Sequence, residues 1–520
     1  MLDPHTLHAA VLFLCAVAAD APSEGEPAAE RWSPVDIRFR STRAHANPFE
    51  IRLSAEVRGP DGVRVVPGFY DGDGTFIVRV CPTSEGEWSL VTTSDDPDLD
   101  GRTASFTCTA NRNARIHGGL KVDAAHPYQF VWEDGTRCFP LGYECDWLWA
   151  LDMGNPALPT LLPFLDKLEA HGFNQIILNA YAHDTGWRPG RSEPEDYGPP
   201  AMFAWEGSNE QPDHTRLNPA FWRHYDRMMT AMLERGIVAH LMVKVYNKLV
   251  TWPEPGSAED DLYFRWLIAR YAAFPNLVWD FSKEANNEPS LDYKLDRIGL
   301  IRREDPYHRL ITVHDDHATY DAGAYDEVLD FRSDQQHGDW HSTILEHRAQ
   351  RRWPVVNVEF GYEHGPRGAD DATYGVVQPP EEVLRRAWEI LMAGGHIAYY
   401  YTYTAWDVIR TDDTPPGYRY FRQLREFMER TQYWLMEPHD DLVSAGHCLA
   451  APGREYIVHL DVAQPLEVDI SAATASMRAE WFDPVTGNRS EAGEVAPGEV
   501  RVSPPEALHA RQAVLHLVAR

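Results

Sequence analysis

The chain has 520 residues, more than a single hydrophobic core ordinarily serves, which predicts two to four domains. Its 43% hydrophobic and 24% charged residues are typical of a mostly globular protein. The net charge of −31 argues against a nucleic-acid or membrane-surface partner, which would need clustered Lys and Arg, and no apolar run is long enough to predict a membrane-spanning helix.

The first 29 residues predict a leader segment. Residues 9–19 form an apolar run that resembles the core of a signal peptide, and Ala19-Asp20-Ala21 resembles a cleavage site. The residues before this run include Asp3 and no Lys or Arg, which is atypical of such a signal. The leader predicts a secreted or periplasmic protein, and a cytoplasmic location is the alternative.

Residues 30–113 predict an antiparallel β-sandwich. Apolar and polar residues alternate over residues 49–57, and Gly/Asp turns follow at residues 59–62 and 71–74. Short strands at this spacing are typical of a sandwich. Cys81 and Cys108 lie within this region and are a candidate pair, although free buried thiols are the favoured state.

Residues 114–437 change to a rhythm in which apolar strands alternate with amphipathic helices. Helical patterns cover residues 161–170, 221–235 and 262–272. Eight such units predict an α/β fold, a closed (β/α)₈ TIM barrel. The predicted strands are residues 138–145, 175–180, 238–245, 277–282, 310–314, 328–333, 355–360 and 396–403.

Residues 438–520 return to short alternating strands. Residues 456–460 and 513–518 read as strands that flank the Trp481-Phe482-Asp483-Pro484 segment. This pattern predicts a second antiparallel β-sandwich at the C-terminus.

Two glutamates stand where a barrel places its chemistry. Active sites of (β/α)₈ barrels lie at the C-terminal ends of the strands. Glu284 follows predicted strand four, and Glu359 lies near the end of predicted strand seven. A glycosidic bond is cleaved by one carboxylic acid that protonates the leaving oxygen and one carboxylate that attacks the sugar or activates water. Facing glutamates about 5–5.5 Å apart predict retention of configuration.

Other polar and aromatic residues at the same strand ends are candidates for binding a sugar. Sugar rings offer hydroxyl groups for hydrogen bonds and apolar faces for stacking on aromatic rings. The predicted substrate-binding residues are Asp146, Trp147, Asn179, His183, Lys244, Lys283, His314, His337, Tyr362, Glu363 and Trp406.

Several short stretches, in this order and spacing, carry a family resemblance. They are residues 68–72, 85–88, 269–279, 358–363 and 481–484. The chain resembles clan A glycoside hydrolases, and more closely the apiosidase-like barrels with an N-terminal sandwich and a C-terminal domain labelled as collagen-binding. The resemblance implies that Glu284 is the acid/base and Glu359 the nucleophile of a retaining enzyme acting on a plant or microbial oligo- or polysaccharide.

One residue departs from the clan pattern. The residue before the strand-four glutamate is usually Asn, whose side chain helps to hold the sugar 2-hydroxyl, and here it is Lys283. Lysine donates hydrogen bonds but cannot accept them. An ammonium close to Glu284 would also favour its ionised form, which suits a general acid poorly.

Several alternatives stay open. Glu288, within Asn287-Glu288-Pro289, and Glu363 are alternative positions for the two catalytic carboxylates. A non-catalytic carbohydrate-binding protein is the alternative function. A metal-dependent hydrolase is another, because His314-Asp315-Asp316-His317, or His337 with His341, contain metal-ligand types. The favoured use of these histidines is sugar binding, so no cofactor and no metal are predicted.

Overall fold

The structure is a computed structural model that describes residues 29–183, 200–316, 323–325, 327–335, 338–368, 376–404 and 408–519. The predicted leader therefore lies outside the described residues, apart from Ala29, and so do His337 and Trp406. No described helix is long and apolar enough to cross a membrane.

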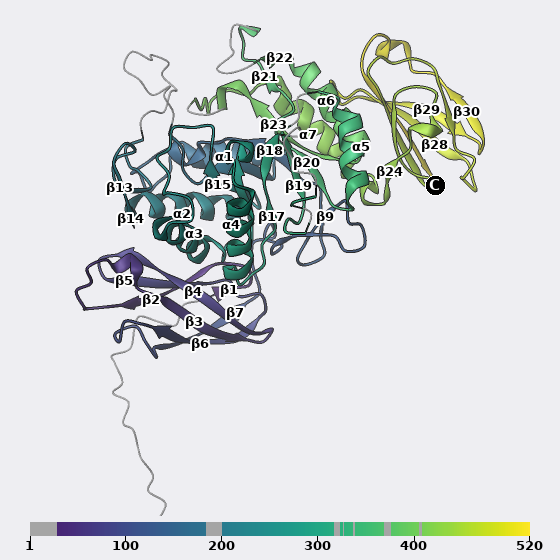
Figure 1. The fold of residues 1–520 in the computed structure, drawn as a ribbon. Helices are drawn as coiled ribbons and strands as arrows, with labels where there is room; N and C mark the ends of the chain where they lie inside the picture. Colours follow the sequence, from purple (N-terminus) through teal and green to yellow (C-terminus); the bar gives the residue numbers. More distant parts are fainter. Residues whose placement is uncertain are drawn as a thin grey trace, which may run out of the picture.

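A mostly parallel sheet forms a nearly closed TIM-like barrel at the centre of the molecule (Figure 1). The sheet order is β17-β16-β15-β12-β11-β23-β20-β19-β18, and every neighbouring pair in it is parallel. Its strands are β11 (Leu141–Glu144), β12 (Gln175–Asn179), β15 (Val238–Val245), β16 (Leu277–Lys283), β17 (Ile311–Thr312), β18 (His314–Asp316), β19 (Arg332–Gln335), β20 (Val355–Asn357) and β23 (His396–Tyr401).

The fifth barrel strand is split in two. β17 pairs with β16, β18 pairs with β19, and Val313 separates the two pieces. Eight strand positions are thus filled by nine segments, and the fold class predicted for the central region is confirmed.

Helices surround the barrel and begin at sequence signals that cap them. Ser257, Ser290 and Asn218 are N-caps whose side chains accept hydrogen bonds from the first turn of the helix. The helices are α1 (Leu161–Ala170), α2 (Pro219–Glu234), α3 (Ala258–Tyr271), α4 (Leu291–Glu304), α5 (Trp340–Gln350), α6 (Pro380–Met392) and α7 (Pro416–Met428).

A small antiparallel sheet underlies the N-terminal end of the barrel. It consists of β8 (Leu120–Val122), β9 (Phe130–Trp132) and β10 (Arg137–Cys138). Phe130 packs edge-on against Phe331, just before β19, with ring centroids 5.3 Å apart. Val238, Met242 and Val278 of the barrel interior join the same buried cluster. This apolar cluster lies between the small sheet and the barrel interior.

The N-terminal region forms one seven-stranded path of paired strands, β1-β7-β6-β3-β4-β5-β2. Residues 48–50 are a 3-10 helix instead of part of the strand predicted over residues 49–57, because Asn47 caps it and Pro48 favours its first turn. The strands are β1 (Ala29–Glu30), β2 (Val35–Arg40), β3 (Leu53–Gly59), β4 (Gly62–Gly72), β5 (Thr75–Val80), β6 (Gly86–Ser94) and β7 (Thr103–Thr109). Cys81 and Cys108 are free and buried.

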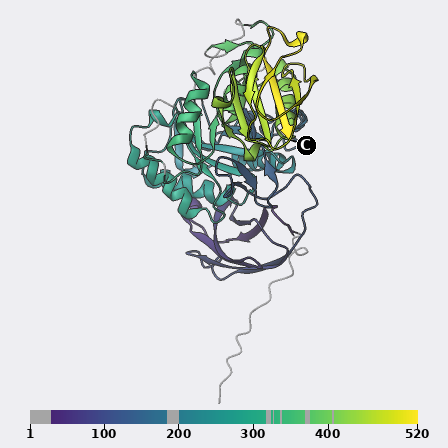
Figure 2. The same cartoon turned by 90° about the vertical axis from the view of Figure 1, so that its right-hand side faces the viewer.

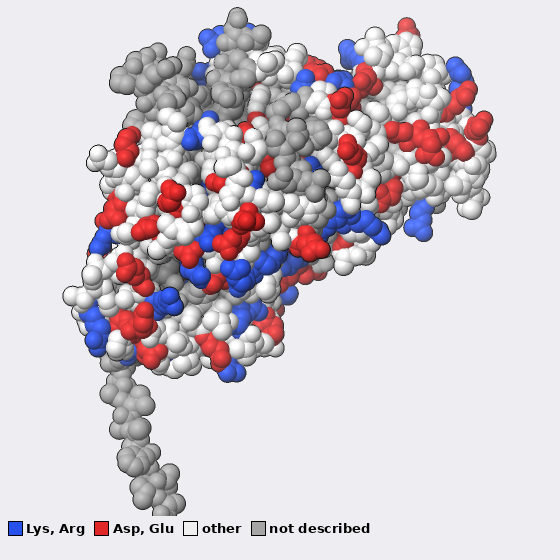
Figure 3. All heavy atoms as spheres, in the orientation of Figure 1, with Lys and Arg blue, Asp and Glu red and all other residues white. Residues whose placement is uncertain are grey.

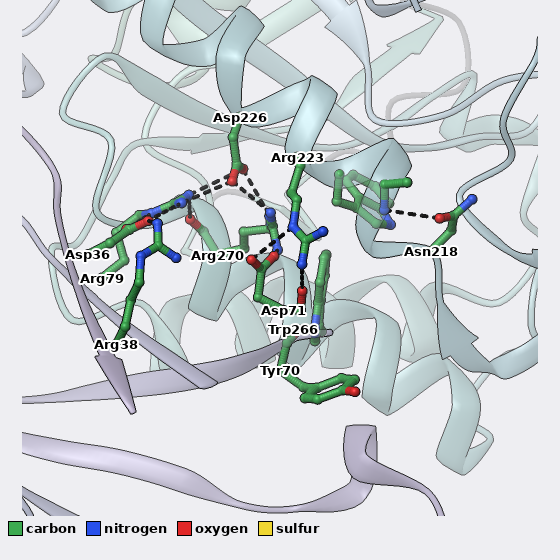
Figure 4. Close-up of polar contacts among 12 residues, drawn as sticks. Asp36, Arg38, Tyr70, Asp71, Arg79, Asn218, Arg223, Asp226, Trp266 and Arg270 are labelled. Atoms are coloured by element: carbon green, nitrogen blue, oxygen red, sulfur yellow. Dashed lines mark hydrogen bonds and ion pairs between the residues drawn. The ribbon is translucent and has the colours of Figure 1, made fainter. Parts of the chain in front are cut away.

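Buried ion pairs hold this sheet against the barrel helices (Figure 4). Arg79 of β5 donates to Asp36 of β2 at 2.6 Å and to Asp226 of α2 at 3.0 Å. Arg270 of α3 donates to Asp226 at 2.7 Å and to Asp71 of β4 at 2.9 Å. The pKa of Asp226 falls to about 2, since the two guanidinium groups outweigh the opposing effect of burial. A cavity of about 710 Å³ lies beside this network.

The C-terminal region contains a six-stranded and a two-stranded sheet on the side of the barrel away from the N-terminal sheet (Figures 1 and 2). Trp388 of α6 packs against His459 and Phe482 of this region. The strands are β24 (Glu437–Pro438), β25 (His447–Ala451), β26 (Glu455–Leu460), β27 (Leu466–Asp469), β28 (Met477–Phe482), β29 (Arg489–Val495), β30 (Glu499–Val502) and β31 (Ala513–Ala519). On the face in Figure 3, acidic and basic side chains are interspersed.

Candidate active site at the barrel mouth

The C-terminal ends of the barrel strands, here called the barrel mouth, position the two predicted glutamates. Glu284 directly follows β16 and adopts a left-handed backbone conformation, with φ 55° and ψ 48°. Non-glycine residues rarely adopt this conformation, and such residues concentrate at functional sites. Glu359 follows β20, and its backbone N–H donates to the Asn357 side chain at 3.1 Å.

A lysine holds three buried carboxylates together at the mouth. The Lys283 ammonium lies 2.6 Å from Glu144 Oε1, 3.1 Å from Asp146 Oδ2 and 3.6 Å from Glu359 Oε2. These four side chains come from the ends of β11 and β16 and from the segment after β20, and all are almost fully buried. Lys283 therefore lies beside the candidate nucleophile.

Burial and mutual charge perturb the protonation of this group. Burial opposes the charged form of Lys283, but Asp146, Glu144 and Glu359 outweigh it and raise the lysine pKa well above its usual value. Burial raises the pKa of Glu144 well above its usual range; Lys283 lowers it, and Asp146 and Glu359 raise it further. Lys283 therefore stays charged, and Glu144 is inclined to hold a proton.

The alternation of side chains along β15 and β16 does not predict which of Lys244 and Lys283 faces the barrel mouth. Val238 and Met242 of β15 point into the barrel, so alternation would place Lys244 inside as well. Its ammonium instead contacts Asp260 of α3 and Tyr293 of α4, each at 2.6 Å. The pairing of β15 with β16 keeps one register, with Lys244 opposite Ser282 and Val245 opposite Lys283. Of the two lysines, Lys283 is the one whose contacts place it at the mouth.

Glu284 has a different environment from Glu359. Its Oε1 atom accepts hydrogen bonds from Asn247 Nδ2 at 3.2 Å and from Gln335 Nε2 at 3.1 Å. Its side chain is half-buried, whereas Glu359 is 3% exposed. The two carboxylates therefore differ in solvent access, and amides contact Glu284 where an ammonium contacts Glu359.

Several buried polar atoms at the mouth have no hydrogen-bond partner in the described part of the chain. They include Glu144 Oε2, Asp146 Oδ1, both side-chain polar atoms of Asn179, and both ring nitrogens of His314. Buried polar groups are nearly always satisfied in folded proteins. A group of such atoms beside two candidate catalytic carboxylates is suited to a ligand with many hydroxyl groups.

A chain of polar contacts inside the barrel links β12, β15 and β16 to the backbone of His314. Gln175 contacts His240 at 3.0 Å, and His240 contacts Asp280 at 2.8 Å. The other Asp280 oxygen accepts from the His314 backbone N–H at 2.9 Å. The His314 ring then lies 3.6 Å from Glu359 Oε2. Successive strands thus fix the backbone that carries this imidazole.

Aromatic rings complete the described part of the mouth. Trp147 is fully buried and stacks on Trp149 with ring centroids 5.7 Å apart. Tyr362 packs edge-on against Tyr400, whose ring lies 5.7 Å from the Lys283 ammonium. Trp147 therefore serves as core packing in this conformation, while Tyr362 belongs to the layer around Lys283.

The structure separates three predicted site residues from this group. Lys244 is engaged with the outer helices, as described above. Glu363 lies against α7, where it accepts hydrogen bonds from Tyr399 OH at 2.8 Å and from Gly417 N–H at 3.2 Å. His183 lies in the loop after β12, with its ring 4.0 Å from Glu210.

Four residues of the mouth were not among the predicted site residues. Glu144, Asn247 and Gln335 end predicted strands, but strand ends carry too many polar residues for sequence position to select among them. Tyr400 lies inside a strand, and alternation with Ala398, which faces the barrel interior, is the signal that could have identified it.

Comparison with known proteins agrees with this architecture. Residues 127–459 match the family described as "Apiosidase-like, catalytic domain", and residues 28–95 match a domain of unknown function, DUF5060. No curated protein sequence matches the chain.

Solved structures share the fold at low sequence identity. A candidate glycoside hydrolase from Bacteroides vulgatus superposes with a TM-score of 0.79 at 21% identity, covering 94% of this chain and 99% of that chain. A glycoside hydrolase family 5 protein from the same species gives a TM-score of 0.59 at 18% identity, covering 77% of this chain and 94% of that chain.

Proposed function

Because the chain belongs to the apiosidase-like family and is a glycoside hydrolase, we propose that it cleaves a plant or microbial oligo- or polysaccharide by a retaining, two-glutamate mechanism. Glu359 is the nucleophile and Glu284 the acid/base. The observation that carries this proposal is the contrast between the two carboxylates: Glu359 is buried 3.6 Å from an ammonium, and Glu284 is half-buried on two amides. Pairs of carboxyl groups in unlike environments take unlike roles.

In the first step Glu359 attacks the anomeric carbon as the glycosidic C–O bond breaks, and Glu284 gives its proton to the departing oxygen. In the second step Glu284 takes a proton from water, the water oxygen bonds to the anomeric carbon, and Glu359 leaves as a carboxylate. The Lys283 ammonium, 3.6 Å from Glu359, favours an ionised nucleophile. Among the described residues no ion pair joins Lys283 to Glu284.

The proton of the acid/base has a defined place in this scheme. Both amides donate to Glu284 Oε1, so we assign the transferable proton to Oε2. The unpartnered atoms of Glu144, Asp146, Asn179 and His314 are assigned to sugar hydroxyls. Glu144 can donate a hydrogen bond to such a hydroxyl from its protonated form.

The experiment is hydrolysis of an aryl-glycoside panel that includes arabinofuranosides, galactosides, glucosides, xylosides, fucosides and apiosides. We expect Glu359→Ala and Glu284→Ala each to lose at least about a thousandfold in kcat/KM on the active substrate. Azide should rescue both: Glu359→Ala gives a glycosyl azide of inverted configuration, and Glu284→Ala one of retained configuration.

Two conservative variants serve as matched controls. Glu288→Gln alters the neighbouring carboxylate, whose Oε1 accepts from Ser290 N–H, and Glu363→Gln alters one that lies against α7. Both should keep activity within a few-fold of the parent. Loss of activity in Glu288→Gln, with Glu284→Ala still active, would show that Glu288 and not Glu284 is the acid/base.

We also propose that each flanking region is a β-sandwich domain, with boundaries near residues 113 and 438. β4 supports this at the N-terminus, because its first half pairs with β3 and its second half with β5, as in a strand that passes between two layers. Limited proteolysis should cut first near these boundaries, whereas cuts within the proposed sandwiches would contradict the division.

A further inference from the structure

We propose that His341, Asp440 and His447 form a zinc site that joins the barrel to the C-terminal region. His341 lies in the first turn of α5, Asp440 begins the 3-10 helix η8 (Asp440–Leu442), and His447 begins β25. One ligand atom from each residue lies within 4.8 Å of the other two, and no other such group of His, Cys, Asp and Glu occurs among the described residues.

The distances suit one small cation. Asp440 Oδ2 lies 3.0 Å from His447 Nδ1 and 3.4 Å from His341 Nε2. Zinc bonds to nitrogen and oxygen are about 2.0 Å, so two ligand atoms of a tetrahedral site lie about 3.3 Å apart. Both Asp440 separations are close to that spacing.

His341 gives an independent reason to expect a ligand here. The residue is 8% exposed, and its Nε2 atom has no hydrogen-bond partner in the described part of the chain although it points toward Asp440. A buried nitrogen without a partner is costly, and a metal ion would satisfy it. Asp440 Oδ1 accepts from the Cys448 N–H at 2.8 Å, which orients the second oxygen toward the two histidines.

The surroundings favour a divalent ion over a simple ion pair. Arg385 pairs with Glu389 at 2.5 Å and with Asp461 at 3.3 Å, so each of these neighbouring carboxylates already has an ion-pair partner. Asp440 remains as the charged ligand beside two imidazoles, a donor set that zinc accepts. Asp440 and His447 are partly exposed, which gives water access to a fourth position.

One side chain must move when the ion binds. The two imidazole rings are nearly parallel, with centroids 3.6 Å apart and an interplanar angle of 18°. Because a metal lies in the plane of each ligating ring, one ring has to rotate for both nitrogens to reach the same ion. The bound ion would then connect segments about one hundred residues apart, a long loop whose closure stabilises the folded chain.

The test is zinc binding by the full chain after dialysis against a chelator. Isothermal titration with Zn²⁺ should give one tight site per chain, and zinc should raise the melting temperature. His341→Ala and His447→Ala should each weaken that site by about a hundredfold or more. Co²⁺ should give an intense visible absorption band typical of four-coordinate geometry, and both variants should lose it.

His439→Ala is the matched control, since His439 lies next to the site but pairs with Asp441 instead. It should bind zinc like the parent. Circular dichroism of all three apo variants verifies that they fold. The proposal is overturned if the parent binds no zinc stoichiometrically, or if both site variants fold and bind it unchanged. This test does not depend on glycosidase activity.

Discussion

Lys283 is the residue on which the charge of the barrel mouth depends. It is the cation in contact with Glu144, Asp146 and Glu359, and replacing it leaves three buried carboxylates without that partner. Breaking a buried ion pair on one side is costly because the remaining charge stays desolvated.

Lys283→Met is therefore expected to lower the free energy of unfolding by roughly 3–5 kcal/mol at neutral pH. The loss should shrink toward pH 5, because unpaired buried carboxylates take up protons and lose their charge. Urea denaturation at pH 5 and pH 8 measures this. A loss of equal size at both values would mean that Lys283 acts through packing alone.

Glu363 offers a second pH-dependent test at this scale. Burial raises its pKa to about 7, in spite of the hydrogen bonds from Tyr399 and Gly417. A carboxyl group whose folded pKa exceeds its unfolded value stabilises the fold at low pH, and this contribution is lost as pH rises from about 4.5 to beyond 7.

Glu363→Gln removes the titrating group while keeping the shape of the side chain. The parent should lose on the order of 1–3 kcal/mol more stability than the variant between pH 4.5 and pH 8. Thermal unfolding across this range measures the difference. Parallel curves for the two proteins would refute the raised pKa.

At the scale of elements, the turn after β16 shows why the acid/base candidate could be located but not described from the sequence. A glutamate that ends a barrel strand is a strong signal by position. Neither the left-handed conformation of Glu284 nor the contact of Lys244 with α3 is encoded in any local sequence pattern. The contacts of the two lysines, and not their places in the strands, show that Lys283 enters the mouth and Lys244 does not.

The same turn yields a stability prediction. A left-handed backbone costs a non-glycine residue about 1 kcal/mol relative to glycine. Glu284→Gly should therefore be more stable than Glu284→Ala by about that amount, although both lack the carboxylate. Chemical denaturation of the two inactive variants compares them directly. A more stable alanine variant would indicate that the turn relaxes in solution.

Strand boundaries could also be predicted only approximately from the sequence. The strand predicted over residues 328–333 lies at Arg332–Gln335, because residues 328–331 approach the sheet as a loop. The eight-unit rhythm could still be recognised, since apolar runs and amphipathic helices alternate regardless of where each strand begins. Side-chain direction at strand ends needs the three-dimensional pairing.

At the scale of the whole molecule, the N-terminal sheet, the barrel and the C-terminal region are joined by contacts that no local sequence pattern predicts. Asp71, Asp226 and Arg270 are far apart in sequence, and only the packing of the N-terminal sheet on α2 and α3 brings them together (Figure 4). The barrel class of the central region was predictable from periodicity, but the partners of these buried charges were not.

Asp226→Asn tests how strongly this junction stabilises the protein. The pKa of Asp226 is lowered to about 2, so its contribution is present above the unfolded value near 4 and is lost as pH falls toward 2. The parent should lose about 2–3 kcal/mol over that interval beyond what the variant loses. Melting temperatures between pH 2 and pH 5 provide the measurement, and identical acid sensitivity would contradict the role of the pair.

The charge balance of the described barrel mouth has a consequence for selectivity. Glu144, Asp146 and Glu359 surround the Lys283 ammonium, and Glu284 lies at the same mouth, so the local potential is negative even when Glu144 carries a proton. Such a potential repels anions and attracts cations, and salt weakens both effects. Sugars that carry a carboxylate should be poor substrates beside their neutral counterparts, and protonated iminosugars should inhibit more strongly at low salt than at high salt.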